Sequence, residues 1–256
     1  MNIHQMTIKE IKVYLDSQKA LAAEEAAVLA ADSRAGVLNA YRQWLRRKEK
    51  EERLAKQWDE MSTMERALWK EGHVYIAGID EVGRGPLAGP VLAAAVILPQ
   101  DFYLPGLNDS KKVPAGDREK MYETIMEEAV SVSIGMCDAP LIDEINIYQA
   151  TLRAMLAAVQ SLHVKATATL NDAVTIPGLH MKQHPIIGGD GKSVSIAAAS
   201  IVAKVRRDRM MAQYDEQYPG YNFASNMGYG TAEHLAALKS LGPTPIHRKT
   251  FAGVLV

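Results

Sequence analysis

The chain has 256 residues, of which 48% are hydrophobic, so it can bury an ordinary globular core and does not belong to the disordered class. Its net charge of -1 argues against a globally basic protein that binds polyanions over its whole surface, and its single cysteine, Cys137, excludes an internal disulfide. The charged N-terminal residues and the lack of a long apolar run are not typical of a signal peptide or a membrane span, so we expect a cytoplasmic protein.

Residues 1–72 form the first predicted unit, an all-helical extension. They contain no proline and only two glycines, the second of which, Gly72, is placed to end the last helix. Apolar residues recur at helical spacing in this stretch. Two pairs with capping-box spacing mark helix starts: Thr7 with Glu10, and Ser62 with Glu65. We therefore expect three or four helices and a domain boundary near residue 72.

A basic stretch lies within this extension at residues 42–56, RQWLRRKEKEERLAK. Seven Lys or Arg stand there against three Glu, which gives a local charge of +4. Such a stretch is typical of a solvated helix face with ion pairs one turn apart. The functional alternative is a helix that grips the phosphates of a nucleic acid, with Arg46, Arg47 and Lys48 at its centre.

From residue 73 onward, short β-rich segments alternate with helical ones, which predicts an α/β domain over residues 73–256. The expected strands are 74–80, 91–98, 130–136, 166–171 and 185–188. The expected helices are 116–129, 141–162, 194–217 and 231–240. We find no internal repeat and no low-complexity segment.

The pattern Gly83-x-Gly85-x-x-Ala88 has the spacing of a dinucleotide-binding motif, which requires a helix directly after the glycines. Prolines and an apolar, strand-like run follow instead, so the required helix is not expected. In addition, Asp80 and Glu81 would repel a pyrophosphate. A nucleotide-binding protein is therefore the less favoured alternative.

Four acids follow three of the predicted strands: Asp80, Glu81, Asp172 and Asp190. In open α/β sheets the carboxyl ends of strands converge on one crevice, so these side chains can share a site. Two like charges about 4 Å apart repel by about 4 kcal/mol at an effective dielectric constant near 20. A cluster of carboxylates therefore requires shared protons or divalent cations. Oxygen ligands favour Mg²⁺ or Mn²⁺, and paired ions of this kind suit phosphodiester hydrolysis.

A purely structural role is the alternative for Asp172 and Asp190, because Asp before Ala or Gly is common in turns at strand ends. The pair Asp80 and Glu81 is harder to explain in this way, because it directly precedes the Gly-Arg-Gly segment 83–85. Neighbouring strand residues point to opposite faces, so both carboxylates reach one crevice only where the strand breaks up. The two glycines supply that break.

Four sequence blocks carry a resemblance to a known family: IAGIDEVGRGPLAGPV at 76–91, NDSKK at 108–112, GGDGKSVSIAAASIVAKVRRDRM at 188–210 and MGYGTAEHLAALKSLGPTPIHRKTF at 227–251. With these blocks the chain resembles bacterial ribonuclease HII, the type 2 ribonuclease H, over most of residues 73–251. The resemblance implies an RNase H-like fold with a mixed five-stranded sheet flanked by helices. It also implies endonucleolytic cleavage of RNA in RNA/DNA hybrids and on the 5′ side of ribonucleotides embedded in duplex DNA, which leaves 3′-hydroxyl and 5′-phosphate ends.

The family binds two Mg²⁺ or Mn²⁺ ions with four acids, and the matching positions here are Asp80, Glu81, Asp172 and Asp190. Asp172 is assigned by its order along the chain, because its neighbours Asn171 and Ala173 depart from the usual sequence context in the family. Asp109 and Asp138 are the alternatives for this third ligand.

In the family, the Gly-Arg-Gly segment recognises the 2′-hydroxyl at the cleavage position, and a tyrosine packs against the following deoxyribose. The matching residues are Gly83, Arg84, Gly85 and Tyr229. A backbone without side chains can approach a sugar closely, and the 2′-hydroxyl distinguishes RNA from DNA.

Phosphate contacts are expected from basic residues near the acids. Lys192 directly follows Asp190 and Gly191, and the helix expected after it, capped by Ser193 or Ser195, would present its positive end to phosphate. Further basic candidates, for most of which simple exposure to solvent is the alternative, are Lys111, Lys112, Lys204, Arg206, Arg207, Arg209, Arg248 and Lys249.

The expected partners are RNA/DNA hybrids and duplex DNA that contains ribonucleotides. We expect no membrane association and a monomer, and a sliding-clamp peptide is not evident in the last residues, FAGVLV. A non-catalytic nucleic-acid-binding protein on the same fold is the second alternative, and the four acids argue against it.

Overall fold

The computed structural model describes residues 3–255, and the chain divides into two compact units, Met1–Gln57 and Trp58–Val256. The first unit is helical. Its elements are η1 (Ile3–Gln5), α1 (Ile8–Ser17), α2 (Ala23–Ala30) and most of α3 (Ala35–Met61). Thr7 and Glu10 form the predicted capping box at the start of α1, with Thr7 N–H donating to Glu10 at 2.7 Å.

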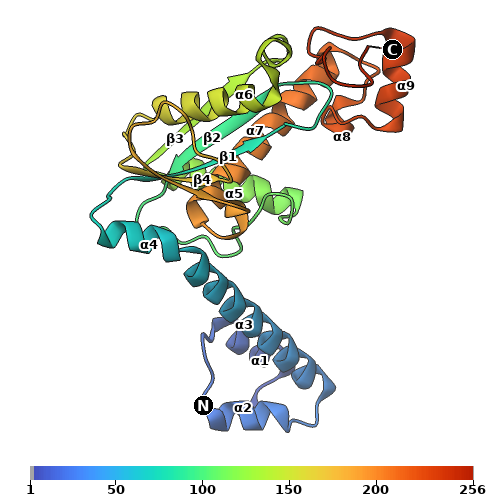
Figure 1. The fold of residues 1–256 in the computed structure, drawn as a ribbon. Helices are drawn as coiled ribbons and strands as arrows, with labels where there is room; N and C mark the ends of the chain where they lie inside the picture. Colours follow the sequence, from blue (N-terminus) through green and yellow to red (C-terminus); the bar gives the residue numbers. More distant parts are fainter. Residues whose placement is uncertain (1–2, 256) are drawn as a thin grey trace. The chain divides into compact units, whose positions relative to one another are not determined.

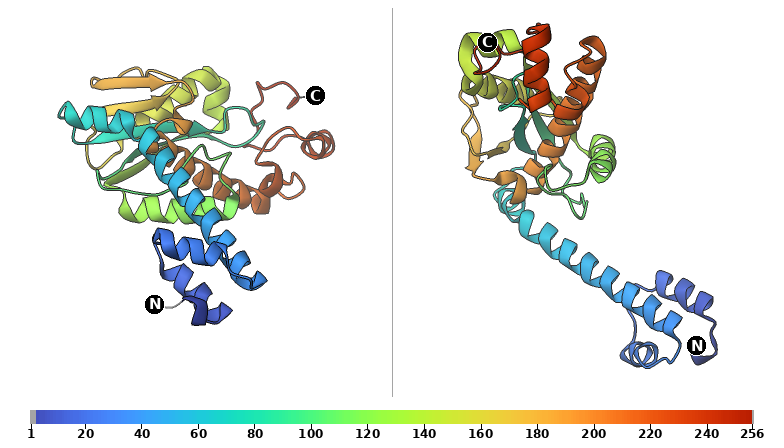
Figure 2. Two further views of the ribbon diagram at one scale, coloured as in Figure 1. Left: turned by 90° about the horizontal axis from the view of Figure 1, so that it is seen from below. Right: turned by 90° about the vertical axis from the view of Figure 1, so that its right-hand side faces the viewer.

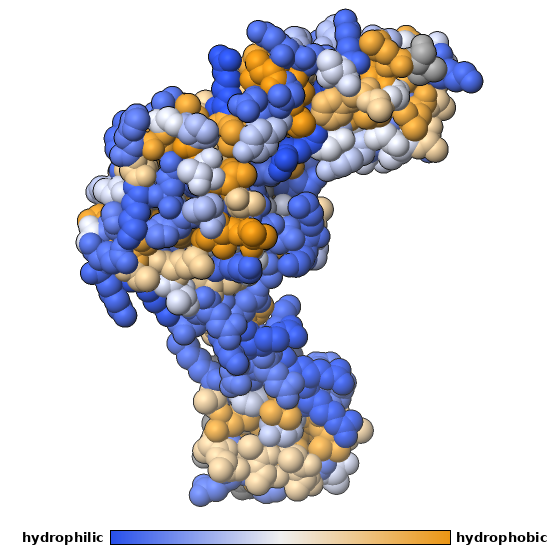
Figure 3. Space-filling view, in the orientation of Figure 1, coloured by the Kyte–Doolittle hydropathy of each residue, from blue (hydrophilic) through white to orange (hydrophobic). Residues whose placement is uncertain are grey.

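A small core of its own stabilises the first unit. Ile11 and Leu15 of α1, Leu29 of α2, and Val37 and Trp44 of α3 are all buried together. The remainder of α3 carries the basic stretch, and this segment is largely hydrophilic in the space-filling view (Figure 3). The helical character predicted for this part of the chain is confirmed.

The second unit contains one mixed five-stranded sheet, as predicted, in the order β3-β2-β1-β4-β5 (Figure 1). Its strands are β1 (Ile76–Val82), β2 (Val91–Ile97), β3 (Ser131–Cys137), β4 (Ala168–Asp172) and β5 (Lys182–Ile186). Its helical elements are α4 (Thr63–Lys70), α5 (Ala115–Glu128), α6 (Ala139–Gln160), η2 (Gly189–Gly191), α7 (Val194–Gln217), α8 (Phe223–Asn226) and α9 (Ala232–Leu241). The pairs β1–β2 and β2–β3 are antiparallel, whereas β1–β4 and β4–β5 are parallel.

Two hydrophobic cores lie on opposite faces of this sheet. Strand β2 is buried along its whole length, with Ala93 and Ala95 in the core that includes α6 and with Ala94 and Val96 in the core that includes α5 and α7. Figures 1 and 2 show α6 on one face and α5 with α7 on the other. Because both faces are covered, β2 is an uninterrupted apolar run and does not alternate between apolar and polar residues.

The predicted elements agree with the structure to within a few residues, and the largest difference is at β5. The sequence predicts this strand at 185–188, and it lies at Lys182–Ile186. It is an edge strand that pairs only with β4, so it tolerates Pro185, which cannot donate a ladder hydrogen bond. The chain from Gly83 to Pro90 is not helical, which removes the helix that a dinucleotide-binding motif requires.

Helix α4 packs into the second unit, where it caps another helix. Leu68 is buried with Ile76 of β1. The predicted capping box of Ser62 and Glu65 is wrong, because Ser62 Oγ donates to Trp58 O and Glu65 is buried elsewhere. Glu65 accepts hydrogen bonds from Ser193 Oγ at 2.5 Å and from Ser195 N–H at 3.0 Å. A carboxylate from α4 therefore covers the N-terminus of α7. The predicted domain boundary near residue 72 stays a prediction. By its packing, α4, which lies before that boundary, belongs to the second unit.

Ser193 is the N-cap of α7, as one of the two expected alternatives, and it accepts from Ile196 N–H at 3.2 Å. Within residues 3–255, no helix has both the length and the apolar character that a membrane span needs.

The close approach of β1 and α7 generates a stability prediction at Gly78. A Cβ added there would overlap the backbone of Ser195, which cannot move without displacing α7. We expect Gly78→Ala to lower the free energy of unfolding by about 2 kcal/mol or more, as overpacking against backbone does. Urea unfolding of the full chain measures this change.

Gly116→Ala is the matched control. Gly116 lies in α5, and an added Cβ there meets nothing within 4 Å. Alanine should therefore leave stability unchanged or raise it by up to about 1 kcal/mol. Equal unfolding midpoints for the two variants would show that the contact between Gly78 and α7 is looser than described.

Candidate active site

The candidate site lies where β1 and β4 separate. Pairing between these strands ends at Ile79 and Asn171, whereas β1 stays paired with β2 as far as Val82. The strand therefore does not break up at Asp80 and Glu81, contrary to the prediction from the sequence. The break is in the β1–β4 ladder instead, and it opens the edge of the sheet beside both carboxylates.

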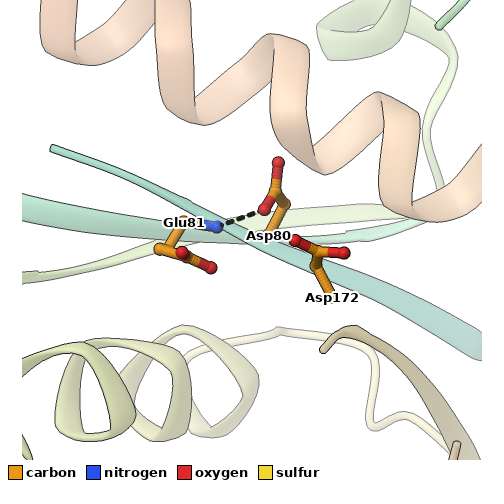
Figure 4. Close-up of side chains that lie close together, drawn as sticks. All are labelled: Asp80, Glu81 and Asp172. Carbon is orange, nitrogen blue, oxygen red and sulfur yellow. Dashed lines mark hydrogen bonds between the residues drawn. The ribbon is translucent and has the colours of Figure 1, made fainter. Parts of the chain in front are cut away.

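Three acids meet at this opening. Asp80, Glu81 and Asp172 each place one carboxylate oxygen within 4.8 Å of the other two (Figure 4). Asp80 points toward α7, and its carboxylate accepts a hydrogen bond from the Glu81 N–H at 2.7 Å. Two strands of the sheet thus bring together residues that lie far apart in the chain.

Burial and mutual repulsion both disfavour the charged forms of these acids. The pKa of Asp80 is well above its ordinary value, because the side chain is buried and because Glu81 and Asp172 are close, although the Ser200 hydroxyl opposes this shift. Burial also raises the pKa of Glu81, and Arg84, whose Nη1 lies 3.5 Å from the Glu81 carboxylate, partly offsets it. The site therefore needs positive charge or protons to reach its lowest free energy.

Asp172 is held in the cluster by its neighbours. Its carboxylate accepts from the Gly189 N–H at 2.7 Å, and Ala173 directly after it has a positive φ of 58° that turns the chain sharply. The buried Asn171 side chain donates to Val174 O at 3.1 Å and to Gln183 Oε1 at 3.0 Å, which stabilises the same turn. Asn171 and Ala173, the neighbours that depart from the usual family sequence, thus form and stabilise the turn that orients Asp172.

The two alternatives to Asp172 lie outside the cluster within residues 3–255. Asp138 is the N-cap of α6 and accepts from Leu141 N–H at 3.1 Å. Asp109 accepts from Lys111 N–H at 2.9 Å. Geometry therefore favours Asp172 as the third acid.

Asp190 lies in η2, beside the cluster rather than within it. Burial raises its pKa, and the charges of Asp109 and Asp172 add to the shift. The hydrogen bond between Asp172 and Gly189 N–H joins this turn to the end of β4. A cation bound between Asp172 and Asp190 would relieve repulsion at both residues.

The predicted sugar-facing residues also lie together. Gly83 has a positive φ of 91°, and a Cβ added at Gly85 would lie 3.5 Å from Cε1 of Tyr229. Tyr229 remains 48% exposed, so a ligand can reach it.

Several predicted phosphate contacts are changed by the structure. The N-terminus of α7 is covered by Glu65, so it does not present its positive end to phosphate. Lys192 is exposed, and its ammonium donates to Ile187 O at 2.8 Å. Arg207 and Arg248 are 1% and 0% exposed, which is incompatible with contact to a duplex backbone.

The sequence does not predict the supporting role of two arginines and two histidines that pack behind the site. Arg207 and Arg248 donate to backbone carbonyls of residues 83–90, and His234 contacts both Tyr229 and His247. A signal was present in the sequence, because His247 and Arg248 are adjacent and lie in one of the blocks that carry the family resemblance. Their burial, however, was not readable from residue type.

Comparisons with known proteins agree with this geometry. Residues 77–254 match the family described as Ribonuclease HII, and residues 7–69 match the family described as Ribonuclease HII N-terminal domain. A Ribonuclease HII from Enterococcus faecalis is 55% identical over 226 residues, which are 87% of this chain and 87% of that protein. A Ribonuclease HII from Bacillus subtilis is 50% identical over 252 residues, 98% of each chain.

A solved structure supports the same conclusion at the level of the fold. The ribonuclease H2 from Pyrococcus horikoshii superimposes with a TM-score of 0.60 at 25% identity, over 70% of this chain and 95% of the other. The family matches together extend over most of the sequence, and the carboxylate cluster lies within the larger match. The chain therefore belongs to the ribonuclease HII family of metal-dependent endoribonucleases.

Proposed function

We propose that the protein cleaves the RNA strand of RNA/DNA hybrids and cuts on the 5′ side of ribonucleotides embedded in duplex DNA, with two divalent cations, Mg²⁺ or Mn²⁺, at its carboxylates. The observation that carries this proposal is the meeting of Asp80, Glu81 and Asp172 at the opening between β1 and β4. The donors are oxygen atoms only, which suits hard cations.

All four acids would contribute ligands to the cations. Asp80, Glu81 and Asp172 would form the first set of ligands, and Asp190 would complete the site from η2, next to Asp172. When bound, paired ions of this kind generate a nucleophile from water and stabilise the leaving oxygen. The hydrogen bonds to Asp80 and Asp172 keep these carboxylates in place, so little reorganisation is needed on binding.

Substrate selection would depend on the exposed parts of the same site. The backbone of Gly83, Arg84 and Gly85 would contact the 2′-hydroxyl of the ribonucleotide, and Tyr229 would pack against the next sugar. Lys192 could reach a phosphate only after releasing its hydrogen bond to Ile187 O.

The alternatives are weaker on the same observations. A dinucleotide-binding protein needs a helix after Gly85, and none follows there. A non-catalytic nucleic-acid-binding protein has no need for three acids that repel one another next to the sugar-facing segment. The single cysteine, Cys137, is buried and is compatible with a reducing compartment such as the cytoplasm.

Cleavage of a DNA duplex that contains one ribonucleotide tests the proposal directly. The protein should cut it with Mg²⁺ or Mn²⁺ and not with EDTA. Asp80→Asn and Asp172→Asn should each lower kcat by about 10²-fold or more, because a ligand that contacts the metal contributes several kcal/mol to the transition state. Glu127→Gln, an exposed change on α5, is the control. Full activity in Asp172→Asn would mean that the third ligand is misplaced.

Replacing Asp80 by Asn should raise the stability of the protein although it lowers its activity. Because folding raises the pKa of Asp80, the ionised side chain lowers the free energy of unfolding. This destabilisation is fully present above the pKa of the folded state and disappears as the pH falls toward the ordinary value near 3.8. In EDTA at pH 7, Asp80→Asn should therefore be about 1–3 kcal/mol more stable than the parent.

Thermal unfolding at several pH values measures this effect. The difference between Asp80→Asn and the parent should shrink toward pH 4, and added Mn²⁺ should stabilise the parent more than the variant. A variant that is less stable than the parent in EDTA at pH 7 would contradict the described charge crowding.

The N-terminal unit would add affinity for the substrate. In the basic stretch, Arg47 is paired with Asp16 at 2.7 Å and Lys48 with Glu51 at 2.6 Å, so these two residues are engaged. Arg42, Arg46 and Arg53 are exposed on one face of α3. We assign the proposed phosphate contacts to these three arginines.

Replacing the three arginines by glutamine should weaken binding to any duplex in EDTA. The slope of log K against log salt should fall by about 0.9 for each phosphate that the variant no longer neutralises. The control removes the same charge from the same unit by the changes Lys9→Gln, Lys12→Gln and Lys19→Gln, at exposed residues. Substitution is preferable to truncation at residue 73, which would also remove α4 and its cap on α7. If the slope of log K against log salt is the same for the two triple variants, Arg42, Arg46 and Arg53 do not contact phosphates as proposed.

A further inference from the structure

We propose that Arg248 and His247, two adjacent buried residues, are positioning residues for ribose recognition: Arg248 fixes the backbone of residues 83–89, and His247 fixes Tyr229 through His234. The inference rests on the proposed function, because it concerns how the same site distinguishes RNA from DNA.

Arg248 uses its whole guanidinium on the sugar-facing segment. Nη2 donates to Gly83 O at 2.5 Å and to Gly89 O at 2.9 Å. Nη1 donates to Arg84 O at 2.9 Å and to Pro86 O at 2.8 Å, and Nε donates to Gly89 O at 3.0 Å. A guanidinium has five N–H groups in a rigid planar fork, and all five are used here.

No carboxylate takes part in these hydrogen bonds, although Arg248 is fully buried. Burial and the charge of Arg207 lower the pKa of Arg248 to about 9, so it stays charged at neutral pH. A buried cation is tolerated when carbonyl dipoles surround it. The oxygen atoms of the segment are therefore held facing inward by the charge of Arg248.

The orientation of the carbonyls determines that of the amides. In a trans peptide the C=O and the following N–H point in opposite directions. With Gly83 O and Arg84 O facing Arg248, the N–H groups of Arg84 and Gly85 face away from it. Neither N–H donates a backbone hydrogen bond within the described part of the chain. They are therefore two oriented donors available to a sugar hydroxyl.

Two contacts place Tyr229 beside the same segment. Pro86 O also binds Arg248, and the Leu87 N–H on the other side of that peptide donates to Gly228 O at 2.8 Å. Gly228 directly precedes Tyr229. At Gly85 itself, an added Cβ would lie 3.5 Å from Cε1 of Tyr229, so the Tyr229 ring lies beside the segment that carries these amides, and the sugar would lie there.

The second part of the support passes through two buried histidines. His234 Nδ1 lies 2.8 Å from Tyr229 O and His247 Nδ1 lies 2.8 Å from the Thr244 N–H, while the two Nε2 atoms are 2.9 Å apart. A carbonyl only accepts and an amide N–H only donates, so the tautomers are determined: His247 Nε2–H donates to His234 Nε2, and His234 Nδ1–H donates to Tyr229 O. Burial lowers the pKa of both rings, that of His247 to about 4, which keeps them neutral.

Binding in Ca²⁺, under conditions in which a gel shows no cleavage, tests the role of Arg248. The probes are a duplex with one ribonucleotide and the same duplex made of DNA alone. The parent should prefer the first, and Arg248→Lys, which keeps the charge but not the fork, should lose about tenfold of that preference. Arg153→Lys, an exposed change on α6, should keep it.

A merely structural role would give another pattern. In that case Arg248→Lys would weaken binding to both duplexes equally and would reduce the stabilisation by Mn²⁺, which reports the carboxylate cluster. Under the proposal, stabilisation by Mn²⁺ stays at the parent value. An unchanged preference in Arg248→Lys overturns the inference, whereas a parent protein with no preference and no cleavage overturns the proposed function instead.

Two variants of His234 test whether the two histidines position Tyr229. They also test the proposal if Arg248→Lys does not fold. His234→Asn places an amide donor near the position of Nδ1 and keeps the hydrogen bond to Tyr229 O. His234→Gln places its amide near the position of Nε2 and keeps the contact with His247 only. We expect His234→Gln to lose about tenfold more of the preference for the ribonucleotide duplex than His234→Asn. Equal preferences would overturn the role of this pair.

Discussion

Repulsion among Asp80, Glu81 and Asp172 is the interaction on which the rest of the site depends. The framework around these acids prevents them from moving apart, since β1 remains paired with β2 through Val82 and Gly78 leaves no space beneath α7. Asp172 is held by the Gly189 N–H. The acids can lower their electrostatic energy only by taking up protons or cations, so the rigid fold makes this site attractive to positive charge.

Much of the positive charge in the second unit is directed away from this site. The N-terminus of α7 is covered by Glu65, and two buried cations, Arg207 and Arg248, are directed at backbone carbonyls. Among the basic groups discussed, only Arg84 lies against the cluster, 3.5 Å from Glu81. The carboxylates therefore remain available to bind a cation.

The sequence predicts the five strands, most helices and the three acids that meet, because these depend on local periodicity and on residues at strand ends, whereas the arrangement of the strands in one mixed sheet is what the family resemblance implies. It places the start of β5 three residues late, since Pro185 favours a strand start and the pattern does not reveal that an edge strand tolerates it. It also gives Glu65, Arg207 and Arg248 other roles than the ones they have. Their actual partners, Ser193, Pro90 and Gly83, are more than 100 positions away, and such pairs leave no periodic pattern. Residue type alone indicates a charged surface group, and only tertiary packing reverses that.

The hydrogen bond between Gly83 and Arg248 joins positions separated by 165 residues. A ribosome therefore completes β1 and its acids long before it adds the arginine that orders the neighbouring segment. Closing so long a loop is entropically costly and is expected to be a late event in folding. Under the proposal for Arg248, a nascent chain that has not yet added this residue would already contain Asp80 and Glu81 but would lack the guanidinium that orders residues 83–89, so selectivity for the sugar would be acquired last.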